Sequence, residues 1–180
     1  KSNRTYFSYS QYATFKSSPK MYYEKYVKNK ETGSTKYQRF GRDLMKNAEF
    51  AELDQVPKLI SERVKKGIVE HPILVKAGLV EKDLYGIIDA VSDDKNHFIE
   101  IKTGKHRWTR DDVIINEQML FYALLIHIET GLVPTAELVY VETKDKGDDV
   151  VFTGFVETFK RTFTLEEILQ FQREVCATIN

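Results

Sequence analysis

Two apolar segments decide the fold: Leu84-Tyr-Gly-Ile-Ile-Asp-Ala-Val91 and His97-Phe-Ile-Glu-Ile-Lys-Thr-Gly104. The stretch 93–96 between them is rich in Asp and Asn, so the pair predicts a β-hairpin. The first segment carries Asp89 near its end, and the second carries Glu100 and Lys102. Because the side chains of a strand alternate between its faces, Glu100 and Lys102 are expected to point the same way. The hairpin thus predicts two carboxylates and one ammonium group close together.

The sequence around this hairpin predicts an α/β fold. Three strands of an antiparallel meander are expected at residues 73–75, 84–91 and 98–102, and two more at 136–142 and 150–158. Helices are expected at 8–26 with an interruption at Pro19, at 40–53, from 57, at 111–130, and after Thr164 with Glu167 in a capping box. Residues 1–180 are therefore expected to form a single domain, a mixed central β-sheet flanked by helices, with 111–130 as the crossover helix.

The composition indicates a folded protein without disulfides. Of the 180 residues, 42% are hydrophobic and 12% aromatic, enough for a buried core. No apolar run reaches the length of a membrane span and no signal-peptide pattern opens the chain, so no membrane association is expected. The single cysteine, Cys176, excludes an internal disulfide and indicates a reducing, cytoplasmic compartment. The 27 basic and 27 acidic residues balance, so a phosphate-binding surface has to be a local basic patch.

The acids of the hairpin suit a hard divalent cation. Mg²⁺ prefers oxygen ligands, keeps several waters and uses few protein groups. Asp89 and Glu100 would supply two ligands and the main-chain carbonyl of Ile101 a third, next to Lys102. Such a cation lowers the pKa of a bound water and neutralises charge that develops on a phosphate. The alternative on spacing alone is a surface salt bridge, because Glu-x-Lys is common on strands.

These motifs resemble those of a known family. Gly86-x-x-Asp89 followed by Glu100-x-Lys102 resembles the core motif of the PD-(D/E)XK nuclease superfamily, and in particular its RecB-like and RecE-like exonuclease branch. Further pieces similar to that branch occur in the same order along the chain: Ser8-x-Ser10 with Phe15, Ser18-Pro19 and Tyr22, then Phe40-Gly41 at the start of a helix, and Gln118-x-x-x-Tyr122 after the lysine. Together these motifs span residues 8–122.

The resemblance implies a restriction-endonuclease-like core and a Mg²⁺- or Mn²⁺-dependent nuclease that hydrolyses DNA phosphodiester bonds, as exonucleases of phage, recombination or repair systems do. It implies that Asp89 and Glu100 bind metal and that Lys102 is the catalytic lysine. Gln118 and Tyr122 lie one helical turn apart, where they could contact the phosphate or position Lys102; core packing is the alternative for Tyr122. Branch members with an iron–sulfur cluster use four cysteines, so no iron–sulfur cluster is expected in this chain.

One position departs from the family pattern. The family's helix usually carries a metal-binding histidine four residues after its glycine, but here that position is Met45, which cannot ligate Mg²⁺. Glu49, one turn further along, is expected to reach the same site, and a solvated helix acid is its alternative role. Glu70 and His71, at the start of a strand, are further candidates. The third ligand is therefore left open: one of these three residues could replace the histidine, or the site could hold a single metal, resemble branches that lack the histidine, or be degenerate.

A basic segment follows the predicted catalytic lysine. Lys105, Arg107, Trp108 and Arg110 combine cations with an aromatic ring, which suits a DNA backbone with a base stacked on the indole. An exposed basic loop with a half-buried Trp108 is the alternative.

Two rival functions also follow from the sequence. The substitution at Met45 would suit a catalytically silent nucleic-acid-binding module on the same fold. The neutral net charge and the 12% aromatic content would suit an interaction subunit of a larger nuclease or recombination complex. The resemblance also allows a homo-oligomer, although no interface is evident in the sequence. DNA is the expected partner in the nuclease interpretation.

Overall fold

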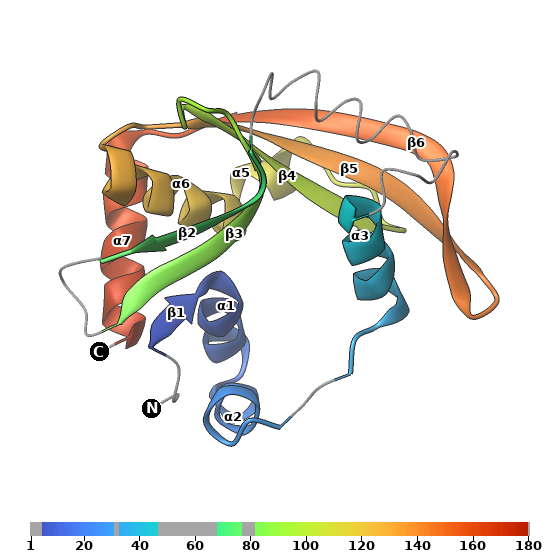
Figure 1. Ribbon diagram of the computed structural model, residues 1–180, viewed down its shortest axis with the longest axis horizontal. Coiled ribbons are helices and arrows are strands. Elements are labelled where there is room, and N and C mark those ends of the chain that lie inside the picture. The colour runs from blue at the N-terminus through green and yellow to red at the C-terminus, as the bar shows by residue number, and fades with distance from the viewer. Residues whose placement is uncertain (1–4, 31–32, 47–67, 77–81, 180) are drawn as a thin grey trace.

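A mixed sheet forms the centre of the molecule (Figure 1). The computed structural model describes residues 5–30, 33–46, 68–76 and 82–179. The strands are β1 (Tyr6–Ser8), β2 (Ile68–Val75), β3 (Asp83–Val91), β4 (His97–Gly104), β5 (Thr135–Lys146) and β6 (Asp149–Thr162). β2, β3 and β4 form the expected antiparallel meander, β4 pairs in parallel with β5, and β5 pairs antiparallel with β6. The expected fold class is confirmed, and β1, parallel to β3, is an additional strand that the sequence did not indicate.

Helices pack on both faces of this sheet. On one face, α6 (Glu117–Thr130) and α7 (Leu165–Ile179) lie side by side (Figure 1) and contribute to the larger hydrophobic cluster. On the other face, Leu44 of α3 (Lys36–Lys46) packs against a smaller cluster of sheet residues: Ala90, Ile99, Val139 and Val141. The middle strands are therefore buried on both faces, which explains why their sequences are nearly continuous apolar runs rather than strict alternations.

The N-terminal helical region is interrupted where the sequence predicts it. α1 (Tyr9–Ser17) is followed by α2 (Pro19–Tyr22) and by a π-helical turn, η1 (Tyr23–Val27). Gln11 accepts a hydrogen bond from the backbone N–H of Ser8 at 3.0 Å, which caps the start of α1. The hydroxyl of Ser18 accepts from the N–H of Met21 at 3.2 Å, and Pro19 occupies the first turn of α2. The Ser and Pro residues of the motif thus set the two helix starts.

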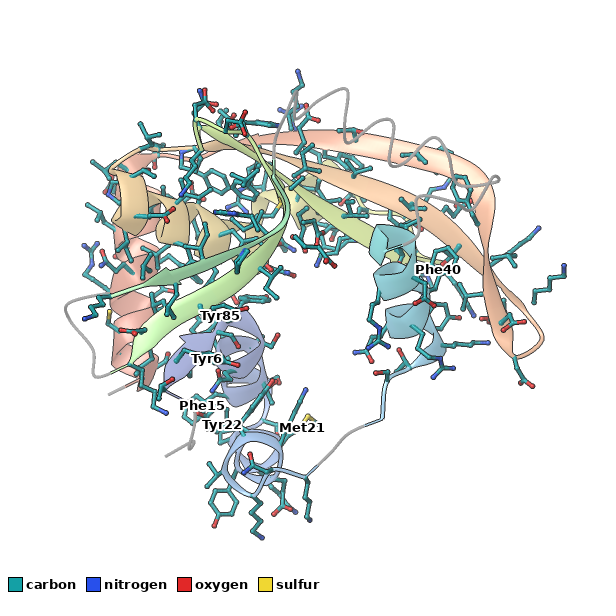
Figure 2. The ribbon with its side chains drawn as sticks, in the orientation of Figure 1. Tyr6, Phe15, Met21, Tyr22, Phe40 and Tyr85 are labelled. Atoms are coloured by element: carbon teal, nitrogen blue, oxygen red, sulfur yellow. The ribbon has the colours of Figure 1, made fainter. Side chains whose placement is uncertain are left out.

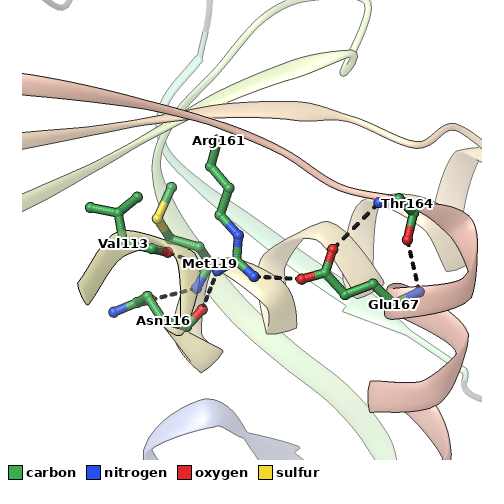
Figure 3. A network of polar contacts seen from close by, with 6 residues as sticks. All are labelled: Val113, Asn116, Met119, Arg161, Thr164 and Glu167. Atoms are coloured by element: carbon green, nitrogen blue, oxygen red, sulfur yellow. Dashed lines mark hydrogen bonds and ion pairs between the residues drawn. The ribbon is translucent and has the colours of Figure 1, made fainter. Parts of the chain in front are cut away.

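The crossover region is two helices, not the single helix expected at 111–130. α5 (Arg110–Ile114) ends at Ile115, and Asn116 starts α6 by accepting a hydrogen bond from the N–H of Met119 at 2.8 Å. Arg161 of β6 lies against this junction and donates to the carbonyls of Val113 and Asn116 at 3.0 and 2.7 Å (Figure 3). The apolar periodicity continued through the junction, so the cap at Asn116 was the overlooked signal.

The C-terminal helix begins as predicted. The N–H of Glu167 donates to the hydroxyl of Thr164 at 3.1 Å, and the carboxylate of Glu167 accepts from Arg161 at 2.8 Å (Figure 3). The expected helix at 40–53 is observed as α3, which begins four residues earlier, at Lys36. Residues 47–53 and the helix expected from 57 lie outside the described residues.

None of the helices within the described ranges is both long enough and apolar enough to cross a membrane.

Candidate active site

The candidate site lies at a break in strand pairing along one edge of β3. β2 occupies the other edge along residues 84–91. On the edge in question, β1 pairs with residues 83–85 and β4 pairs with residues 90–91. Neither of these strands pairs with residues 86–89, and β4 turns away from β3 at this point (Figure 1). The break leaves room for side chains between β3 and β4.

Asp89 of β3 connects to β4 at the point where the two strands separate. Its Oδ2 accepts a hydrogen bond from the backbone N–H of Ile101 at 2.7 Å. Because β3 and β4 have separated here, this amide has no strand partner in β3, and the carboxylate takes the place of the missing ladder bond. The sequence prediction that Asp89 stands beside the Glu100–Lys102 segment is therefore confirmed in geometry. The carbonyl of Ile101 lies in the same segment, and Ile101 lines the cavity described below.

Glu100 and Lys102 form an ion pair on one side of β4. The ammonium nitrogen of Lys102 lies 2.7 Å from Oε1 of Glu100. The Glu100 side chain is 3% exposed and the Lys102 side chain 24%, so this pair is largely withdrawn from water rather than the surface salt bridge considered as the alternative. The other carboxylate oxygen of Glu100, Oε2, is buried and has no hydrogen-bond partner among the described residues. A buried carboxylate oxygen without a donor is costly, and a bound cation would satisfy it.

Gln118 and Tyr122 extend this arrangement onto α6. Lys102 donates a second hydrogen bond to Oε1 of Gln118 at 2.5 Å, and Nε2 of Gln118 donates to the hydroxyl of Tyr122 at 2.9 Å. The two motif residues thus lie on one face of the helix and position Lys102. Tyr122 is also buried, so it combines core packing with the hydrogen bond to Gln118, and a role in cleavage stays a prediction.

Gly86 allows α6 to approach the sheet at this point. A Cβ atom on Gly86 would lie 2.7 Å from Cδ1 of Leu125 and 2.9 Å from Cε1 of Tyr122, both too close for real contacts. Gly41 of α3 has a similar though milder constraint, because its Cβ would lie 3.3 Å from Oγ1 of Thr103. Both motif glycines therefore mark close packing around the site.

Burial dominates the electrostatics of the acids. The pKa of Asp89 is raised to about 8, first because its carboxylate is desolvated and second because Glu100 is nearby, while the amide of Ile101 opposes the shift. Burial also raises the pKa of Glu100 against the opposing attraction of Lys102. For Tyr122, burial and the charge of Glu100 raise the pKa well above its usual value, so its hydroxyl stays protonated. A cation that enters this site would displace protons and keep the carboxylates charged.

A cavity of about 410 Å³ opens in front of these residues. Asp89, Glu100 and Lys102 form one part of its wall, and Arg42 of α3 contributes a second cation. Glu70 of β2 lines the same cavity. It stands between Val69, which pairs with Ala90, and His71, which pairs with Ile88, so it is the neighbour of Asp89 across the strands. Its φ of 51° is a left-handed conformation that is strained in a strand, as is common at functional sites.

The structure separates the candidates for the residue that replaces the family's histidine. Met45 belongs to α3, whereas Glu49 lies outside the described residues and stays a prediction. Glu70 reaches the cavity, but His71 is not among the residues that line it. Within the described parts of the chain, no three His, Cys, Asp or Glu side chains are already close enough to enclose one ion. Asp89, Glu100 and Ile101 line the cavity together, and Glu70 is an exposed acid that lines it as well. The sequence could not select Glu70, because its position depends on the register of β2 with β3.

The basic segment after Lys102 is partly neutralised by acids of β5. Lys105 pairs with Asp145, and Nε of Arg107 lies 2.9 Å from Glu142, with the guanidinium 4.0 Å from the centre of the Phe155 ring. Trp108 is half-buried and packs against the larger hydrophobic cluster, and Arg110 starts α5. These contacts fit the alternative interpretation, an exposed basic loop, better than a row of unpaired cations along which DNA could bind. Contact of Lys105, Arg107, Trp108 and Arg110 with nucleic acid stays a prediction.

Similar proteins are known for both the sequence and the fold. A family model of the PD-(D/E)XK nuclease superfamily matches residues 46–180. A candidate exonuclease from Eubacterium rectale has a TM-score of 0.61 at 12% identity, with 97% of this chain and 79% of that chain covered. A phage-related exonuclease from Haemophilus somnus 129PT has a TM-score of 0.55 at 14% identity, with 94% and 76% covered. No curated protein matches. At these identities the solved structures show the shared fold, while the family match rests on the sequence itself.

Proposed function

Because the chain belongs to the PD-(D/E)XK nuclease superfamily, we propose that it is an exonuclease that hydrolyses DNA phosphodiester bonds with Mg²⁺ or Mn²⁺. The observation that carries this proposal is the buried Oε2 of Glu100, to which no described residue donates a hydrogen bond, beside Asp89 and Lys102 in one cavity. Two carboxylates that face a lysine suit a cation and a phosphate together. Of the phage, recombination and repair contexts that the sequence suggests, the phage-related exonuclease that shares the fold supports the first.

The donor set fits a hard divalent cation. Asp89, Glu100 and the carbonyl of Ile101 would hold it, and Glu70 would join them after a rotation of its exposed side chain. Oxygen ligands of this kind suit Mg²⁺ and Mn²⁺ and not metals that prefer thiolates. Cys176 is buried, belongs to α7 and does not line this cavity. When bound, the cation would lower the pKa of an attacking water and offset the charge of the phosphate.

The chain's own residues would then orient and neutralise the reacting groups. Lys102 presents an ammonium group that Glu100 and Gln118 hold in place from two sides, so it can stabilise negative charge that develops on the phosphate without reorganisation. Tyr122 fixes the amide of Gln118 and keeps that hydrogen-bond chain in one orientation. Arg42 of α3, which also lines the cavity, is a second group that can contact the phosphate.

The central test is the variant Lys102→Ala. We expect it to lower the rate of DNA cleavage in Mg²⁺ or Mn²⁺ by roughly 100-fold or more, because a positioned charged group is lost from the transition state. Lys160→Ala is the matched control, since Lys160 is exposed on β6 and does not line this cavity. It should cleave at the unmutated rate. Equal rates for Lys102→Ala and the unmutated chain would refute the assignment.

The catalytically silent alternative is tested by the unmutated protein. It predicts DNA binding without nicks or loss of ends in Mg²⁺, Mn²⁺ or Ca²⁺, on single-stranded and on double-stranded DNA. Cation-dependent release of nucleotides from DNA ends would support the exonuclease proposal. Cleavage of closed circular DNA would instead indicate endonuclease activity at the same site.

A further inference from the structure

A second cavity opens at the same break in the sheet. It has a volume of about 220 Å³ and lies between β1, the start of α1, β3 and α6. The rings of Tyr6, Tyr9 and Tyr85 contribute to its walls. A cavity of roughly 150 Å³ accommodates a benzene molecule in an engineered protein. The second cavity therefore has room for one planar aromatic base, and we call it the tyrosine pocket after these three residues.

The lining of the tyrosine pocket is aromatic and polar but uncharged. Besides the three rings, it contains the hydroxyl groups of Ser8 and Ser10, the amide of Gln118, and the apolar Gly86 and Ile87; Tyr122 completes it. No charged side chain is among these described lining residues. A phosphate would need cations at such a site, whereas a nucleobase needs a flat ring to stack on and neutral hydrogen-bonding groups. The chemistry of the walls favours the base.

Two of the rings already form a platform. Tyr85 of β3 and Tyr6 of β1 lie next to each other beside α1 (Figure 2), with ring centres 4.8 Å apart and planes tilted by 48°. Both residues are half-buried, and both line the pocket. The parallel pairing of Ser8 with Tyr85 fixes the two strands at this point. The platform is therefore held by the sheet and not by a mobile loop.

Gln118 connects the tyrosine pocket to the cavity of about 410 Å³ that Asp89, Glu100 and Lys102 line, which we call the catalytic cavity. It lines the pocket, and its Oε1 also accepts the hydrogen bond from Lys102 at 2.5 Å. Gly86 and Asp89, three residues apart on β3, line the pocket and the catalytic cavity respectively. A nucleotide whose phosphate lies at Lys102 would thus have a neighbouring base next to the tyrosine rings.

From this juxtaposition we infer that the tyrosine pocket binds an unpaired nucleobase of the nucleotide next to the scissile phosphate. The inference rests on the proposed nuclease function for its ligand and deepens it, because a base has to leave its helical stack to enter such a pocket. Single-stranded DNA, or a frayed DNA end, is then the favoured substrate class. The Ser8-x-Ser10 motif gains a role as well, since it places Tyr9 and two hydroxyl groups in the pocket.

The test compares binding of single-stranded and duplex DNA dodecamers by fluorescence anisotropy in EDTA, where no cleavage occurs. Tyr85→Leu should weaken single-stranded binding by about tenfold, the size expected for one lost stacking contact, and leave duplex binding unchanged. Tyr85→Phe should restore it, because the ring is retained. Tyr23→Leu is the control, since Tyr23 is 50% exposed and does not line the pocket.

A second readout uses single-stranded dodecamers with one 2-aminopurine, whose fluorescence falls when the base stacks on an aromatic ring. The unmutated chain and the control Lys160→Ala should both quench it, and Tyr85→Leu and Tyr6→Leu should not. Unmutated affinity and quenching in both leucine variants would overturn the inference, as would an equal loss of single-stranded and duplex binding. Because these measurements need no cleavage, they judge the pocket even if the chain proves not to be a nuclease.

Discussion

At the scale of single residues, the interactions of Asp89 shift its pKa in opposite directions. Its carboxylate replaces a missing ladder bond to Ile101, yet burial and Glu100 raise its pKa to about 8. In an unfolded chain the same group titrates near pH 3.9. The folded protein therefore binds an extra proton between about pH 4 and pH 8, and its stability decreases as the pH rises through this range.

The variant Asp89→Asn should remove this pH dependence. The amide oxygen can still accept from Ile101, but the group no longer ionises. In EDTA, the melting temperature of the unmutated protein should fall more steeply between pH 5 and pH 8.5 than that of Asp89→Asn. The variant should therefore be the more stable of the two at pH 8.5. Parallel melting curves across this range would contradict the assigned shift of the pKa of Asp89.

The proximity of the hairpin's two acids to its lysine was also the most predictable feature of the candidate site. Asp89, Glu100 and Lys102 lie in two strands joined by a short turn, so alternation and the turn alone bring them together. Glu70 could not be placed in the same way, because its approach depends on the pairing of β2 with β3. The tyrosine pocket was hidden for the same reason: Tyr6 and Tyr85 come together only through β1.

At the scale of elements, the site depends on how closely α6 approaches β3. Gln118 reaches Lys102, and Tyr122 reaches Gln118, because Gly86 has no side chain between the helix and the strand. Most helices and strands were predictable because their apolar periodicity is strong. The division of the crossover into α5 and α6 was missed, because the apolar periodicity continues past the local cap at Asn116 and because Arg161 stabilises the junction from a strand that is distant in sequence. Such a long-range contact leaves no periodic signal.

The variant Gly86→Ala tests this approach. Its new methyl group would meet Leu125 and Tyr122 below 3.0 Å, so α6 has to shift. We expect a loss of about 1–3 kcal/mol in the free energy of unfolding, as for overpacked cores, and a lower cleavage rate because Gln118 moves with the helix. Gly33→Ala is the matched control, since a Cβ on Gly33 meets nothing within 4 Å. Unchanged stability and activity in Gly86→Ala would contradict the close packing.

At the scale of the whole molecule, the acids of the catalytic cavity come from three neighbouring strands. Glu70 belongs to β2, Asp89 to β3 and Glu100 to β4. A cation that binds all three would connect the strands on both sides of the break in pairing. Since it binds the folded chain and not the unfolded one, it stabilises the fold as its concentration exceeds its dissociation constant.

Mn²⁺ should therefore raise the melting temperature of the unmutated protein in a concentration-dependent way. Glu70→Gln should shift the titration to higher Mn²⁺ concentration, because a charged oxygen ligand is lost, while Glu129→Gln, at the surface pair with Lys95, should leave it unchanged. Identical titrations for Glu70→Gln and the unmutated chain would exclude Glu70 as a ligand. Glu49 would then be the remaining acidic candidate for the third ligand.

The pairing of β1 with β3 has a consequence for biosynthesis. Ser8 pairs with Tyr85, so the first strand emerges from the ribosome long before its partner. At about 5–20 residues per second, roughly 4–15 seconds separate the two during translation. Throughout this interval the aromatic residues near the amino terminus have no sheet to join, and the acids of the hairpin have not been made. The growing chain would thus lack the acids and the lysine of the candidate site until the β3–β4 hairpin has been translated.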